Sequence, residues 1–242
     1  NGGTLKYVRV EYAGKKLTDN TSEMNGFSFY SVGSGTVLEN LVAYKGADDG
    51  FEFYGGTVSA KNLISYGNFD DSFDWQDGWR GDANTNWYAY QVGTGNYGME
   101  IEAKSINNAF GPKVSNITLT RAAGTVTEGG SSANEFDAIQ FKKEGNGEYT
   151  NVVISGYTTS NTTLTATAVR IQDKSTNDNQ VTGGKIKMFN VKINDGTSQF
   201  AGVGTTFTVA FPTGNYTTST TATGATLTAG AWAIVDGVSL IK

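Results

Sequence analysis

Short segments that alternate apolar and polar residues recur along the chain. Six of them place apolar residues second and fourth and a polar residue third: GFSFY (26–30), GFEFY (50–54), SFDWQ (72–76), GMEIE (98–102), AIQFK (138–142) and AVRIQ (168–172). This alternation predicts β-strands, because successive side chains of a strand point to opposite faces. We call these segments the short repeats and expect their apolar residues, Trp75 included, to point inward and their polar residues outward.

A second type of segment lies between the short repeats, and we call its members the Asn repeats. They read ENLVAY (39–44), KNLISY (61–66), TNWYAY (85–90), SNITLT (115–120), TNVVIS (150–155) and FNVKIN (189–194), with KYVRVEY (6–12) as an earlier copy that lacks the Asn. The shared residues are Asn40, Asn62, Asn86, Asn116, Asn151 and Asn190. Asn residues stacked at a sharp turn form ladders of side-chain amides, which pair with backbone groups that the turn leaves free.

The two repeats together predict an all-β fold, a single-stranded parallel β-helix. Each coil contains one strand of each type, and like positions stack about 4.8 Å apart from coil to coil. A β-sandwich also has alternating strands, but it does not require the same Asn in six copies. We expect the right-handed form, which is the usual hand of crossovers between parallel strands.

The repeats also set the predicted domain organisation. The spacing between successive Asn residues grows from 22 to 39 residues along the chain. The later coils therefore carry insertions, such as residues 120–137 and 156–168, which we expect on one face of the solenoid, often a binding face. We assign residues 1–196 to β-helix coils and the irregular Thr/Gly-rich residues 197–242 to final coils and a C-terminal cap of the same domain.

Composition removes several classes of function. The net charge is −5 without a basic stripe, which argues against nucleic acid as a partner. No apolar run is long enough for a membrane span. His and Cys are both absent, so disulfides, zinc, haem and His-based triads lose their usual groups. Any metal would be bound by oxygen, with Ca²⁺ as the best candidate.

Composition also indicates a location. Richness in Gly, Asn, Thr and Tyr without Cys is typical of exported bacterial surface proteins, so we expect an extracellular or cell-surface location. The chain starts at once with a strand and shows no signal peptide, and we therefore expect it to be a fragment of something longer.

The acidic residues fall into two groups when the coils are aligned. Asp49, Asp71 and Asp137 precede short repeats at a turn position, where Asp side chains bond nearby backbone amides. Turn chemistry does not require an acid at Asp48 or Asp70. A Ca²⁺ site is expected from this density of acids, although the chain has no EF-hand loop. Its candidate ligands are Asp48, Asp70, Asp74 and Asp77.

The polar third positions of three successive short repeats are also acidic. Glu52, Asp74 and Glu100 would stack about 5 Å apart, although like charges in such a row are unfavourable. Solvent screening, a raised pKa or a bridging cation would each relieve the repulsion. If the protein is an enzyme, these three residues are its candidate catalytic carboxylates, because glycosidases use pairs at such separations. The candidate ligand-binding residues are Tyr54, Trp79, Trp87 and Arg80.

Residues 3–90 resemble a group of secreted or cell-surface proteins of Bacteroidota and some marine Gammaproteobacteria. The most specific parts are DDGFEFYGGT (48–57) and DDSFDWQDGWRG (70–81). The resemblance implies a β-helix fold and a surface location, but no reaction. The C-terminal half departs from the pattern through its longer insertions and its Thr-rich end.

The sequence therefore favours a non-catalytic extracellular β-helix, which would serve as a stalk, a filament subunit or an adhesin-like module. In this hypothesis Ca²⁺ stabilises the coils, and the partners are other surface proteins or copies of the same chain. The alternative is a module that binds or degrades polysaccharide on the outer face of the short repeats, since many parallel β-helices degrade acidic polysaccharides.

Overall fold

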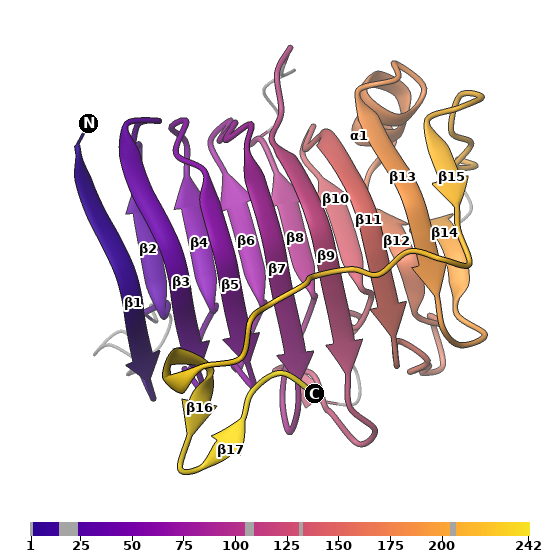
Figure 1. Cartoon of the computed structure of the whole chain (residues 1–242). Helices are drawn as coiled ribbons and strands as arrows, with labels where there is room; N and C mark the ends of the chain where they lie inside the picture. Colours follow the sequence, from indigo (N-terminus) through magenta and orange to yellow (C-terminus); the bar gives the residue numbers. More distant parts are fainter. Residues whose placement is uncertain (1, 15–23, 105–108, 131–132, 204–206) are drawn as a thin grey trace.

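A computed structural model describes residues 2–14, 24–104, 109–130, 133–203 and 207–242. The chain winds into a parallel β-helix whose odd-numbered strands from β1 to β15 form one sheet and whose even-numbered strands from β2 to β14 form the other (Figure 1). We call them the odd sheet and the even sheet. This architecture confirms the predicted parallel β-helix.

The odd sheet contains the Asn repeats, and the even sheet contains the short repeats. In spatial order the odd sheet comprises β1 (Gly3–Glu11), β3 (Thr36–Tyr44), β5 (Ala60–Tyr66), β7 (Asn84–Gln91), β9 (Lys113–Arg121), β11 (Gly147–Ser155), β13 (Ile186–Ile193) and β15 (Tyr216–Thr218). The even sheet comprises β2 (Phe27–Tyr30), β4 (Phe51–Tyr54), β6 (Phe73–Gln76), β8 (Met99–Glu102), β10 (Ile139–Lys142), β12 (Thr167–Ile171) and β14 (Ser198–Gly202).

Equivalent repeat positions pair across neighbouring coils. Phe51 of β4 stands opposite Phe73 of β6, and the next residues, Glu52 and Asp74, are also partners. β1 pairs with β3 in the same parallel register, so KYVRVEY is an earlier copy of the Asn repeat, as predicted. This register brings like side chains from successive coils into contact.

The core contains the apolar residues that the alternation predicts. All twelve apolar positions of the short repeats are buried. Their aromatic rings stack from coil to coil, with centroids 4.9 Å apart for Phe27 and Phe51 and 5.0 Å apart for Phe29 and Phe53. The polar positions between them alternate with the core residues, and several of them are buried too, including Glu52, Asp74 and Gln140.

Each shared Asn bends its strand. All six Asn residues adopt the left-handed backbone conformation, with φ between 56° and 59°. Asn tolerates this conformation better than most residues. The side-chain amide of Asn62 donates to Asn40 over 2.8 Å, and that of Asn86 donates to Asn62 over 3.1 Å. A third amide pair joins Asn151 to Asn116 in later coils.

The amide ladder is not continuous. Asn116 donates to the hydroxyl of Thr85 instead of to Asn86. At the last coil, the backbone of Asn190 donates to Thr217. The left-handed bend is therefore common to all six positions, whereas the amide ladder joins only some of them.

Residues 197–242 contribute strands to both sheets and then form a separate terminal segment. They first supply β14 and β15, which extend the two sheets by one coil. The chain then turns back across the outer face of the odd sheet (Figure 1) and ends in a small hairpin of β16 (Ile234–Val235) and β17 (Val238–Ser239) near β1 and β3. We call residues 219–242 the return segment.

Polar and apolar contacts hold the return segment in place. Asn151 accepts from the backbone of Thr223, and Asn86 accepts from the backbone of Thr226. Its hairpin buries Ala233, Val235 and Leu240 on a second apolar cluster, formed by the outward residues Val42, Ile64 and Tyr88. The odd sheet is therefore apolar on both faces in its N-terminal coils.

The few helical segments are short. Within the described residues they include α1 (Lys174–Thr176), a π-helical turn (Asn177–Val181) and a 3₁₀ turn (Ala231–Ala233). None of the helices in the described ranges is long and apolar enough to cross a membrane.

The second apolar cluster predicts the effect of truncating Leu240. This side chain is 1% exposed, so Leu240→Ala should lower the free energy of unfolding by about 2–4 kcal/mol. Val238 lies in the same hairpin at 52% exposure, so Val238→Ala should change it by less than about 0.5 kcal/mol. Denaturant titration of both variants checks this, and equal effects would contradict docking of the hairpin.

The bends predict different results for two substitutions of Asn62. Asn62→Ala loses both amide hydrogen bonds and places Ala in a left-handed backbone conformation that strains any residue with a Cβ atom. We therefore expect the free energy of unfolding to fall by about 2–3 kcal/mol. Asn62→Gly loses the same bonds without the backbone strain, and its loss should be about 1 kcal/mol smaller. Denaturant titration measures both, and equal losses would show that the bend adds no strain.

Candidate functional site

The outer face of the even sheet carries a row of acidic side chains. The sheet register places Glu52 opposite Asp74, and Asp74 opposite Glu100. Neighbouring strands lie about 4.8 Å apart, so the three carboxylates stand side by side. Glu52 and Asp74 are only 5% and 7% exposed, although they point away from the core.

A second column of acids lies at the turn before the even strands. Asp49 accepts a hydrogen bond from the backbone of Asp71 over 2.9 Å, and Asp71 accepts from that of Tyr97 over 2.6 Å. Asp137 accepts in the same way from Thr167. The turn position was predicted to bond nearby backbone amides. Each of these carboxylates instead accepts from a backbone amide of the next coil.

The two columns meet in a cluster of carboxylates. Asp49, Glu52 and Asp74 are all buried, and one carboxylate oxygen from each lies within 4.8 Å of the others. A second group meeting the same criterion contains Asp48, Asp49 and Asp70. Asp49 belongs to both groups, so a continuous acidic cluster spans two coils.

Asp74 is the least satisfied member of the cluster. Its Oδ1 atom is buried and has no hydrogen-bond partner. Burial raises the pKa of Asp74 well above its usual value, and the charges of Glu100 and Glu52 raise it further. Burial also raises the pKa of Asp49 and of Asp71, and the charges of neighbouring acids, Asp74 for Asp49 and Asp70 for Asp71, raise it further.

Glu52, by contrast, is well supplied with donors. It accepts hydrogen bonds from the amide of Asn25, the hydroxyl of Tyr54 and, over 2.6 Å, the amide of Gln76. The ring of Tyr54 stacks on Tyr30 with centroids 4.2 Å apart. Tyr54 therefore orients a member of the cluster, and its ring contributes to an aromatic pair on the same face.

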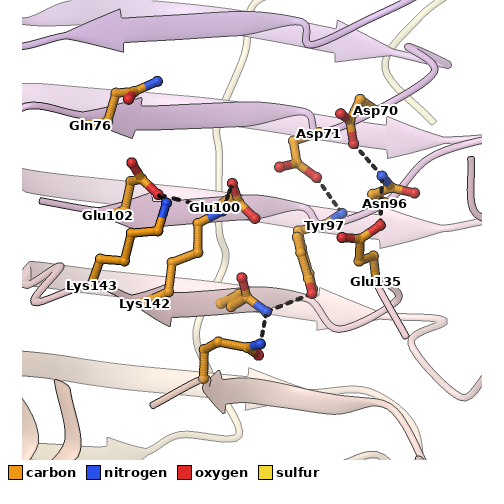
Figure 2. A network of polar contacts seen from close by, with 12 residues as sticks. Asp70, Asp71, Gln76, Asn96, Tyr97, Glu100, Glu102, Glu135, Lys142 and Lys143 are labelled. Carbon is orange, nitrogen blue, oxygen red and sulfur yellow. Dashed lines mark hydrogen bonds and ion pairs between the residues drawn. The ribbon is translucent and has the colours of Figure 1, made fainter. Parts of the chain in front are cut away.

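Lysines neutralise the end of the acidic row nearest the C-terminus. Lys142 lies 2.5 Å from Glu100 and 3.5 Å from Glu102, and Lys143 lies 2.8 Å from Glu102 (Figure 2). The charge of Glu100 raises the pKa of Lys142 against the opposing effect of burial. Lys142 therefore stays positively charged, and these three ion pairs engage Glu100 and Glu102 but not Asp49, Glu52 or Asp74.

Asp70 stands at the edge of the cluster. It accepts from the amide of Asn96, which also reaches Glu135 over 3.4 Å (Figure 2). Burial raises the pKa of Asp70 to about 7, with further contributions from the charges of Glu128, Glu100 and Asp48. Asp70 consequently changes its charge near neutral pH.

The structure rearranges the predicted metal ligands. Asp48 and Asp70 share one group, and Asp74 lies in the other. Asp77 belongs to neither group among the described residues, and it pairs with Lys104 over 3.0 Å at the surface. Asp77 points away because it follows the strand, beyond the last residue of β6.

The prediction of ligand-binding residues is wrong for Trp79 and Trp87. Trp79 and Trp87 are 1% and 0% exposed, and they lie in the core. Their indole nitrogens donate to the carbonyls of Val58 and Ala60. Arg80 is exposed, but it lines a different hollow, beside Thr57 and Asp82. Trp87 occupies the inward position that Leu41 and Leu63 fill in the preceding coils, and Trp79 packs against the core rings of Phe53 and Trp75.

For Asp49, the sequence predicted only a structural role in the turn and not membership of the acidic cluster. One of its oxygens does hold the backbone of the next coil. A carboxylate accepts several hydrogen bonds, so one side chain serves the turn and the cluster together. The signal was present in the sequence, because Asp49 lies three residues before Glu52, on the same coil.

Comparison with known proteins identifies a family. A family model described as a pectate-lyase like beta helix domain matches residues 1–235, which is nearly the whole chain. No curated protein and no solved structure matches this chain.

The raised pKa of Asp70 predicts how stability depends on pH in metal-free protein. The folded protein holds a proton that the unfolded chain releases near pH 4, so stability decreases as pH rises from about 4 to 7. After chelation and gel filtration, the melting temperature should be lower at pH 7.5 than at pH 5, by roughly 2–4 °C for each kcal/mol lost.

Two substitutions test the assignment to Asp70. Asp70→Asn should reduce this pH dependence by the share that Asp70 contributes, and the remainder should come from Asp49, Asp71 and Asp74, whose pKa values are raised too. Asp82→Asn at an exposed position should leave the pH dependence unchanged. A melting temperature that rises steadily from pH 5 to 7.5 in the wild-type protein would contradict the prediction.

Proposed function

Because this chain belongs to the pectate-lyase-like β-helix domain family, we propose that it is a non-catalytic, calcium-stabilised module on the outside of a bacterial cell. It would act as a stalk, filament or adhesin-like part, with other surface proteins or further copies of the chain as partners. The observation that carries the proposal is the buried cluster of Asp49, Glu52 and Asp74, in which Oδ1 of Asp74 has no hydrogen-bond partner.

The cluster needs positive charge. Three buried carboxylates within 4.8 Å of one another repel, and burying an unpaired charge is costly. Either protons or a cation must offset this repulsion. At neutral pH a cation is the better partner, because it can contact all three groups together, and Oδ1 of Asp74 offers a ligand atom that no protein donor occupies.

The donor set selects the ion. Every candidate ligand atom is a carboxylate oxygen, and the chain has no His or Cys to offer a softer ligand. Carboxylate oxygens are the usual ligands of Ca²⁺, which accepts irregular geometry more readily than Mg²⁺ does. Asp49 and Glu52 belong to one coil and Asp74 to the next, so a bound ion would hold two coils together.

The same geometry weighs against catalysis by this cluster. Glu52 is held by three donors, and Asp74 is too deeply buried to reach a glycosidic oxygen. A lyase needs a free base, but Lys142 is paired with two carboxylates. These contacts favour a structural role over the alternative of polysaccharide degradation by Glu52, Asp74 and Glu100.

Calcium should raise the melting temperature. Binding to the folded state alone adds about 2.7 kcal/mol of stability when the free ion is at 100 times its dissociation constant. For a chain of this size, that corresponds to roughly 5–10 °C. Calorimetry of metal-free protein at pH 7.5, with and without millimolar CaCl₂, measures the shift.

Two matched substitutions locate the ion. Asp74→Asn should abolish the calcium shift and raise the stability of the metal-free protein, because it removes a buried charge. Asp77→Asn, which changes an acid outside the cluster, should keep the full shift. An unchanged midpoint for the wild-type protein in calcium would remove the ion from the proposal.

A further inference from the structure

A second polar site lies on the even sheet, closer to the C-terminus than the acidic cluster. It is a cavity of about 330 Å³, which lies within the usual size range for small-molecule sites. The floor comes from the turn before β8 and from β10 and β12, and two inserted loops form a wall. The lining residues are Tyr97, Ala133, Asn134, Glu135, Asp137, Gln140, Leu164, Arg170, Gln172 and Val203.

The wall of the cavity is held in place by contacts between the two inserted loops. The amide of Asn161 donates to Oδ1 of Asn134 over 2.9 Å and to the carbonyl of Ala133 over 3.1 Å. The hydroxyl of Thr163 also donates to Asn134. These are the long insertions that the sequence predicts on a binding face, and their cross-links form the wall before any ligand arrives.

The floor of the cavity is rigid. Arg170 donates to both oxygens of Asp137 over 3.0 Å and also to the carbonyls of Thr165 and Gly202. Both members of this ion pair are buried, and their charges cancel. The pair therefore fixes the shape of the floor without attracting an ion of either sign.

Neutral hydrogen-bonding groups cover much of the remaining surface. Gln140 donates to the hydroxyl of Tyr97 over 2.6 Å and to Oε1 of Gln172 over 3.1 Å. These two bonds use both amide hydrogens of Gln140, so Gln140 offers its carbonyl oxygen as an acceptor and Gln172 offers its amide hydrogens as donors. Leu164 and Val203 add small apolar surfaces among them.

The charge of the cavity limits its ligand. Once Asp137 and Arg170 cancel, Glu135 leaves the lining with one negative charge, and the acidic cluster lies close by. An anionic ligand would therefore be repelled. A single carboxylate amid amides is also a poor cage for an ammonium group, which prefers several acids or aromatic faces.

We propose that this cavity binds one neutral pyranose unit of a glycan. Sugar hydroxyls both donate and accept, which matches the amide hydrogens of Gln172, the carbonyl oxygen of Gln140 and the carboxylate of Glu135. The C–H faces of the ring match Leu164 and Val203. The cavity shares no lining residue with the cluster of Asp49, Glu52 and Asp74, so a bound sugar would contact none of those carboxylates. It gives the module a specific partner, a neutral glycan, in addition to its structural role.

Saturation-transfer NMR and calorimetry test the proposal with the methyl glycosides of glucose, galactose and mannose. At least one should bind with a dissociation constant on the order of 1 mM, which is typical of a small open site. Glucuronate and glucosamine, as charged counterparts, should bind at least about tenfold more weakly. Binding should be the same in calcium and in EDTA, so its outcome is independent of the calcium proposal.

Two variants tie the binding to this cavity. Leu164→Trp should fill the cavity and abolish binding. Gln172→Ala should weaken binding at least about fivefold and leave the buried pair of Asp137 and Arg170 intact. Gln199→Ala, at an exposed Gln that borders another hollow, should bind like the wild-type protein. Absence of binding by all three neutral glycosides, preference for a charged sugar, or unchanged affinity in Gln172→Ala would each overturn the proposal.

Discussion

The parallel register between coils governs the rest of this molecule. Because each strand pairs with the equivalent strand of the next coil, every side chain has a neighbour of the same repeat position about 4.8 Å away. That spacing suits aromatic rings, which stack along the core, and amides, which donate from one coil to the next. It is unfavourable for carboxylates, and the acidic cluster is the consequence.

Hydrogen bonds and ion pairs offset much of the repulsion between these carboxylates. Asp49 and Asp71 each bind a backbone amide of the following coil, and Glu100 faces Lys142. Asp74 is the place where these contacts do not suffice, since one of its buried oxygens has no hydrogen-bond partner. Architecture and function therefore share the same side chains, which is why an acid in a turn position can also serve a site.

The sequence could predict what the repeat determines. The alternation around Phe51 and Phe53 identified the core, and the recurring Asn identified the bends, since both signals are local and repeated. It could not predict the burial of Trp79, which lies outside the aligned positions, or the path of the return segment. The contacts that fix that path, such as the one between Thr223 and Asn151, join residues 72 positions apart. Such contacts produce no repeating pattern in the sequence.

The return segment changes how the solenoid should fold. In a simple solenoid each coil contacts only its neighbours, so coils can form and open almost independently. Here Arg9 of the first coil donates to the carbonyl of Ile234, at a separation of 225 residues, and the segment crosses the coils between them. The first coils thus gain their full stability only after the last residues of the chain have docked, which couples the two ends into one cooperative unit and slows folding.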